Sequence, residues 1–228
     1  MLLRNHFSFL TMKRVLPVAS VPQNIFDNAF AFCASTCRVQ HIDASHDEHH
    51  MARVARLTER LNVASGREIG QDEKDVMILA AFTHDLCDHK YTDVAAGLAH
   101  IETWLKSQPI SEDQRRAVCR IISTMSYSKV KAYGYPTDLG KWTLAYHHTR
   151  IADLIDAYDI ERCYQYQSHK HPDMAEVDKW RAVIEVFERR VLTQKDEFIL
   201  PVAPYAADIV EPRHTVAKWG IGEFKKLL

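Results

Sequence analysis

Glycine is scarce in this sequence, supplying 7 of 228 residues. Tight turns often need the positive φ angles that glycine adopts freely, so this scarcity argues against an all-β fold with many turns. Neither of the glycine-rich phosphate-binding patterns, GxGxxG or GxxxxGK[ST], occurs in the chain. We therefore expect no glycine-rich phosphate loop.

The cysteines show no pattern of a disulfide framework, because their number is odd and no CxxC pair occurs. Cys33 and Cys37 are four residues apart, a spacing that suits packing along one helix better than a zinc ribbon. We expect free thiols, a reducing compartment and, as the first interpretation, a cytoplasmic location. The five cysteines are Cys33, Cys37, Cys87, Cys119 and Cys163.

An excess of charge of either sign is also missing. Lysine and arginine number 29 against 30 acidic residues, which leaves a net charge of −1. No overall field then favours a nucleic-acid polymer or an anionic membrane. No apolar run approaches the roughly 20 residues of a membrane-spanning helix. We expect a soluble protein that binds neither, while self-association into an oligomer stays open.

The N-terminal 26 residues have an unusual composition, with Arg4, Lys13 and Arg14 but no acidic residue before Asp27. Such a segment is typical of organelle transit peptides, which would indicate a mitochondrial location. The alternative is an ordinary N-terminal arm, with Met12 as the true start. We accordingly separate residues 1–20, an arm or targeting segment, from a domain that covers residues 21–228.

The spacing of apolar residues predicts an all-α protein with one central helical bundle. With 228 residues, 46% of them apolar, the chain can fill one domain well. We expect a loop over residues 126–140, and a C-terminal helical extension after the bundle. Helices are expected over residues 23–36, 46–63 (capped by Ser45), 72–86, 94–107, 111–125, 139–158, 173–198 and 214–228.

Ionisable residues stand where apolar residues are expected in three of these segments. His46 and His50 are four residues apart, the stretch LAAFTHDL ends in His84 and Asp85, and Asp153 lies among apolar neighbours. A buried charge needs a partner or a metal, and one divalent cation held by His50, His84, Asp85 and Asp153 would satisfy all four. The alternatives are an ion pair of Asp153 with Arg150 or Arg162, and hydrogen-bonded core histidines.

The segments HHMARV, THDL and IADLIDAY together resemble the HD-domain metal-dependent phosphohydrolase superfamily. That superfamily includes cyclic-nucleotide phosphodiesterases, guanosine-tetraphosphate hydrolases and deoxynucleotidases. The resemblance covers roughly residues 25–165 and extends more weakly to about residue 215. It implies a single HD-domain helical bundle with one divalent ion (Mn, Mg, Fe or Zn). The implied metal ligands are His50, His84, Asp85 and Asp153.

The resemblance also implies roles for residues near the metal ligands. His46 stands where the phosphodiesterases have a proton-donating histidine, and Asp88 where the guanosine-tetraphosphate hydrolases carry an acid that handles the water. The SYSK segment, which begins with Ser126 and ends with Lys129, resembles a substrate-side loop. In the HD subgroup of small bacterial and eukaryotic phosphohydrolases that carries this loop, a histidine often stands at the position of Met125. Its replacement by Met125 puts a second, histidine-rich metal site in doubt.

The residue chemistry supports similar roles. Asp88 lies three residues after Asp85, so in a continuous helix it would reach a water on the metal, whereas in a broken helix it would cap the end near Lys90. His46 could protonate a leaving oxygen or only orient another group. Lys90, Ser126 and Lys129 are the candidate substrate-binding residues, although both lysines suit an ordinary surface equally well.

We therefore expect a metal-dependent phosphohydrolase that acts on a nucleotide or another small phosphorylated metabolite through a metal-activated water. The main alternative is a non-catalytic HD module, stabilised by its metal, that binds a nucleotide or a protein partner. A di-iron oxygenase is a third interpretation, which needs more ligating histidines than this sequence places. Tyr158, Tyr164 and Tyr166 are expected near the rim of the site, mainly as packing residues.

Overall fold

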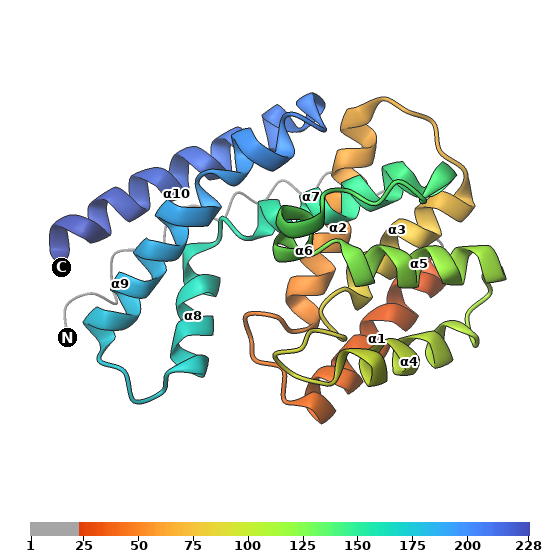
Figure 1. Ribbon diagram of the computed structural model, residues 1–228, viewed down its shortest axis with the longest axis horizontal. Coiled ribbons are helices and arrows are strands. Elements are labelled where there is room, and N and C mark those ends of the chain that lie inside the picture. Colours follow the sequence, from red (N-terminus) through yellow and green to blue (C-terminus); the bar gives the residue numbers. More distant parts are fainter. Residues whose placement is uncertain (1–22) are drawn as a thin grey trace.

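The computed structural model describes residues 23–228, so the expected arm or targeting segment over residues 1–20 lies outside the described residues. The described part is all-α and contains no strand, as predicted, and its helices pack into a bundle (Figure 1). The α-helices are α1 (Gln23–Gln40), α2 (Glu48–Ser65), α3 (Gln71–Thr83), α4 (Val94–Leu105), α5 (Glu112–Thr124), α6 (Tyr127–Tyr133), α7 (Thr143–Asp156), α8 (Ile160–Lys170), α9 (Glu176–Val186) and α10 (Ala207–Leu227).

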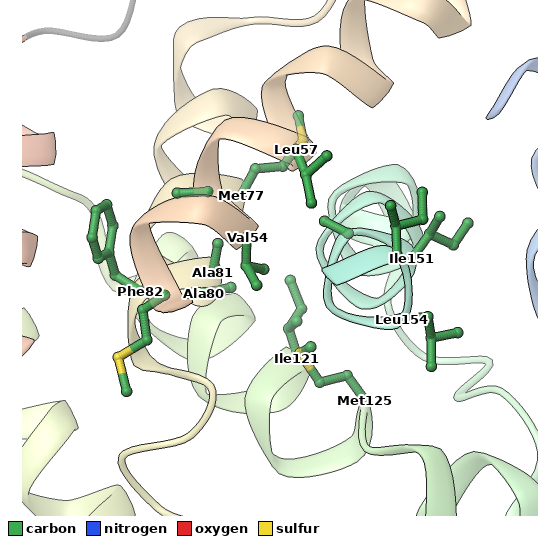
Figure 2. Packing of buried hydrophobic residues seen from close by; sticks show 14 of the residues in the cluster. Val54, Leu57, Met77, Ala80, Ala81, Phe82, Ile121, Met125, Ile151 and Leu154 are labelled. Atoms are coloured by element: carbon green, nitrogen blue, oxygen red, sulfur yellow. The ribbon is translucent and has the colours of Figure 1, made fainter. Parts of the chain in front are cut away.

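Helix α3 is the central element of the bundle. Every side chain from Asp75 to Thr83 is buried, and the helix packs against α1, α2, α5 and α7. Figure 2 shows part of this core, with Met77, Ala80 and Ala81 of α3 near apolar side chains of α2, α5 and α7. Because the apolar run continues to the last turn of α3, the two residues that follow it, His84 and Asp85, are delivered to the interior.

Helix α2 begins later than the sequence suggested. Its N-cap is Asp47, whose carboxylate accepts hydrogen bonds from the backbone N–H groups of His49 (3.0 Å) and His50 (3.1 Å). The predicted cap, Ser45, instead bonds to Asp43 in the preceding loop. His46 therefore precedes α2, and the prediction that it shares a helix face with His50 was wrong.

Three other segments also differ from the predictions. The expected loop over residues 126–140 contains α6, and α8 was not expected. The expected helix over residues 173–198 is α9 followed by two π-helical segments, Phe187–Val191 and Lys195–Ile199. Helix α10 starts at Ala207, before residue 214, and contains Pro212 inside it.

The C-terminal helices form one side of the molecule. Helix α9 packs against α8 and α10, and these three lie together at one end of the view in Figure 1. One cluster of buried apolar side chains runs from Ile25 of α1 to Ile221 of α10. Among the described residues, no helix has the length and apolar character needed to cross a membrane.

Candidate metal centre

Three helices bring the four predicted metal ligands together. His50 lies in the first turn of α2, His84 and Asp85 directly follow α3, and Asp153 lies on α7. Nε2 of His50 is 3.3 Å from Nε2 of His84, 3.3 Å from Oδ2 of Asp85 and 3.6 Å from Oδ1 of Asp153. Nε2 of His84 lies 3.3 Å from the Asp85 carboxylate and 3.7 Å from that of Asp153.

These separations suit atoms that share one metal ion. Ligands bound at roughly 2.0–2.3 Å to a common ion lie roughly 3–4.5 Å from one another. The ligand atoms of His50, His84 and Asp153 all lie within 4.8 Å of each other, so this group could hold a metal ion. Oδ2 of Asp85 faces the same point, where it is buried without a hydrogen-bond partner. An unpaired buried carboxylate oxygen is costly, and a cation would satisfy it.

The charges at this centre also call for a cation. Burial by itself would lower the pKa of His84, but the carboxylates of Asp85 and Asp153 outweigh burial and raise this pKa well above its usual value. Burial would raise the pKa of Asp153, yet its hydrogen bond with His84 and the charge of His84 lower that pKa to about 2. Without a bound ion, a protonated His84 thus offsets part of the charge of the two carboxylates, and a divalent cation that displaces this proton would offset more of it.

The ion pairs of Asp153 expected as an alternative do not form. Arg150 is buried and donates to the hydroxyl of Tyr135 (3.0 Å) and to the carbonyl of Phe198 (3.4 Å). Arg162 forms its ion pair with Asp156, at 3.3 Å. Asp153 keeps 26% of its side chain exposed, so it faces the cavity and is not enclosed as the sequence suggested.

Asp156, which the sequence analysis did not single out, holds the imidazole of His50. Its Oδ2 lies 2.7 Å from Nδ1 of His50, and Nε and Nη2 of Arg53 bond to the same carboxylate, both at 3.2 Å. Burial would raise the pKa of Asp156, but His50, Arg162 and Arg53 hold it well below its usual value. The available signal was a second aspartate one helical turn after Asp153.

The hydrogen bonds around Asp156 determine which nitrogen of His50 faces the candidate ligands. Nη1 of Arg162 also lies 2.8 Å from Nδ1 of His50, but a guanidinium only donates, so Arg162 and Asp156 need opposite tautomers. We favour donation from Nδ1–H of His50 to Asp156, because the carboxylate then accepts from both neighbours. The lone pair of Nε2 is thereby directed at His84 and the two aspartates, as metal-ligating histidines require.

His46 belongs to a separate hydrogen-bonded network. Burial lowers its pKa to about 3, so the imidazole is neutral at physiological pH. The ammonium of Lys90 lies 3.1 Å from Nε2, which must accept this bond. Nδ1–H then donates to Ser45 (2.6 Å), and Ser45 donates to Asp43 (2.5 Å), which also accepts from Tyr91. This geometry favours an orienting role for His46, which accepts a hydrogen bond from the ammonium of Lys90.

Asp88 does not continue α3 as the catalytic interpretation required. The helix ends at Thr83 and the chain turns, with the N–H of Asp88 donating to the carbonyl of Asp85 at 3.1 Å. The Asp88 carboxylate accepts the backbone N–H of Lys90 (2.9 Å) and lies 3.4 Å from its ammonium. The alternative reading, in which Asp88 shapes the turn, therefore has the better geometric support.

A cavity of about 990 Å³ opens above the candidate metal ligands. This volume lies at the upper end of the range for small-molecule sites. The cavity wall includes Lys90, Ser126 and Lys129, the three predicted substrate-binding residues. The ammonium of Lys129 is held by the carbonyl of Ser123 at 2.8 Å. Also in the wall are His46, His84, Asp85, Asp88, Met125, Tyr127, Asp153, Asp159, Arg162, Tyr166, His169, Lys170 and Arg190.

Comparison with known proteins supports the fold. No family model and no curated protein matches this sequence. A crystal structure of a protein from Lactobacillus plantarum, a structural genomics target, is similar over 91% of this chain and 98% of its own. The TM-score is 0.67 at 19% sequence identity. At that identity the likeness shows a shared helical fold and carries no statement about activity.

Proposed function

We propose that this protein is a metal-dependent phosphohydrolase that acts on a nucleotide or another small phosphorylated metabolite. The observation that carries the proposal is the meeting of two imidazoles and two carboxylates at the base of a large cavity with cationic side chains. The resemblance of this H…HD…D arrangement to the HD-domain phosphohydrolases supports the same activity.

The proposed metal ligands are His50, His84, Asp85 and Asp153. This mixed nitrogen and oxygen set suits Mn²⁺, Fe²⁺, Zn²⁺ or Mg²⁺. A divalent ion held there would supply Lewis-acid activation of a phosphoryl oxygen and a water nucleophile at neutral pH. Asp156 would keep Nε2 of His50 free for the ion by accepting the proton on Nδ1.

The chain's other cavity residues would bind the phosphate. Lys90, oriented by His46 and Asp88, presents an ammonium that can donate to a phosphate oxygen or to the leaving oxygen. Lys129 is fixed by the carbonyl of Ser123, and its remaining N–H groups are free to donate. Ser126, which is 3.4 Å from the hydroxyl of Ser128, adds a neutral donor in the same wall.

One observation favours the second candidate function, a metal-stabilised module that binds a nucleotide or a protein partner without catalysis. Asp88, the acid expected to handle the water, accepts a backbone hydrogen bond and pairs with Lys90. A binding module needs no such acid, whereas a phosphohydrolase would then rely on the ion alone to generate the nucleophile.

The replacement Asp88→Asn separates these roles. Because an amide oxygen can accept the N–H of Lys90 as the carboxylate does, we expect the fold, metal affinity and turnover to stay within a few-fold of wild type. The measurement is turnover at saturating Mn²⁺ beside a metal titration. A general base would give a different result, because its loss lowers turnover by about 10²–10⁴-fold.

The proposed activity is tested with the purified full-length chain, a panel of nucleoside mono-, di- and triphosphates, and assay of released phosphate. Metal analysis of the same preparation should give one divalent ion per chain. We expect Mn²⁺-dependent release for wild type and for the control Asp138→Asn, a replacement at an exposed residue that pairs with Arg120. The variant Asp153→Asn should lose the activity. Bound metal without hydrolysis of any substrate would support the binding module instead.

A further inference from the structure

Arg190 is an exposed cationic residue in the wall of the cavity. It lies on the π-helical segment Phe187–Val191 and lines the cavity, yet it forms no ion pair with any acid in the described part of the chain. Its neighbours on that segment are paired elsewhere: Glu188 with Lys225 at 2.6 Å, and Arg189 with Glu185 at 2.7 Å. Glu188 and Glu185, the two acids nearest to Arg190 along the chain, are therefore already engaged.

The guanidinium of Arg190 is held in place by an aromatic ring. Its central carbon lies 4.2 Å from the ring centroid of Tyr127, which lines the same cavity and packs edge-on against Phe198 (5.3 Å). A guanidinium held over a ring can keep its five N–H donors, which lie at its edge, available for hydrogen bonding. Arginine held in this way is suited to bidentate recognition of a phosphate.

Each acid of the cavity wall interacts with another group, and none of them forms an ion pair with Arg190. Asp85 and Asp153 belong to the candidate metal centre, and Asp88 pairs with Lys90. Asp159 caps α8, where its carboxylate accepts the backbone N–H of Arg162 at 3.2 Å. The cavity therefore has an acidic part that would bind a cation and a basic part that would bind an anion.

We propose that Arg190, stacked on Tyr127, forms an anion subsite that takes a second phosphate of the substrate, apart from the one at the metal centre. The inference rests on the proposed phosphohydrolase function and narrows its substrate to metabolites with two or more phosphate groups. The cavity of about 990 Å³ has room for such a molecule.

The test compares Arg190→Gln with Arg189→Gln, a matched control on the same segment whose side chain is outside the cavity wall and pairs with Glu185. Binding of adenosine 5′-monophosphate, adenosine 5′-diphosphate and adenosine 3′,5′-bisphosphate to the Mn²⁺-loaded protein is measured by calorimetry, with phosphate release checked in the same samples. At least one of the two-phosphate ligands should bind wild type and Arg189→Gln tenfold or more tightly than the monophosphate. Arg190→Gln should lose this preference, since a charge-assisted bidentate contact contributes about 10- to 100-fold.

Kinetics provide the second readout. With hydrolysed substrates that carry two phosphates, Arg190→Gln should raise KM about 10-fold or more, whereas Arg189→Gln should keep the wild-type KM. The binding arm stands even if no substrate is hydrolysed, so a failure of the proposed activity is distinguishable from a failure of the subsite. Equal affinity of wild type for the three ligands, no binding of any, or a preference retained by Arg190→Gln would overturn the subsite.

Discussion

Replacing Asp85 with alanine should abolish Mn²⁺-dependent phosphate release and the stabilisation that the metal gives to the fold. Asp85 faces both imidazoles at 3.3 Å, and its Oδ2 is buried without a hydrogen-bond partner. A metal that binds only the folded state, present at 100 times its dissociation constant, stabilises by about 2.7 kcal/mol. For a chain of this size that corresponds to about 5–10 °C in Tm.

Thermal melts with and without a chelator measure this effect. Wild type should melt about 5–10 °C lower when the ion is removed, while Asp85→Ala should melt at the same temperature in both conditions. Asp138→Asn, which alters an exposed ion pair with Arg120 and no candidate metal ligand, should behave as wild type. A wild-type melt that is unchanged by chelation would show that the ion is not bound as proposed, whatever the activity of the variant.

Replacing Asp156 with alanine should have the largest effect on stability. The buried carboxylate compensates Arg53 and Arg162 and accepts from Nδ1 of His50. Its removal leaves these donors without their acceptor, and breaking a buried ion pair from one side costs about 3–5 kcal/mol. We expect a fall in Tm of about 6–20 °C in the chelated protein, measured by thermal or denaturant unfolding.

The same replacement should weaken metal binding, because the tautomer and orientation of His50 are no longer fixed. Loss of such a supporting contact lowers metal affinity by about 10- to 100-fold, which a Mn²⁺ titration measures. The variant Asp156→Asn serves as comparison, since it keeps the shape but cannot compensate two arginines. If the alanine variant retained wild-type stability and affinity, Asp156 would have no role in holding His50.

Local sequence patterns were enough to predict the helices of the core and to single out the residues that could hold a metal ion. The apolar run of α3 predicts a buried helix, and its end therefore predicts that His84 and Asp85 reach the interior. The same reasoning predicted that Asp153 is buried beside them, whereas its side chain lies beside them but stays 26% exposed at the cavity. These predictions succeeded because burial and helical periodicity are properties of a short stretch of chain.

Segment boundaries were harder to predict because caps and breaks depend on a few local hydrogen bonds. Two neighbouring residues, Ser45 and Asp47, could both cap α2, and the choice of Asp47 moved His46 out of the helix. The turn after Thr83 took Asp88 out of line with Asp85. Neither outcome follows from periodicity, and each changes the chemistry that the residue can perform.

The sequence by itself determined that the chain is helical and that His50, His84, Asp85 and Asp153 are the residues to bring together. Only the tertiary structure decided what supports them. The contact between His50 and Asp156 spans 106 residues, and Arg190 reaches the cavity from a segment after α9. Such pairings depend on how whole helices pack against one another, and a charge partner far along the chain leaves no periodic signal in either segment.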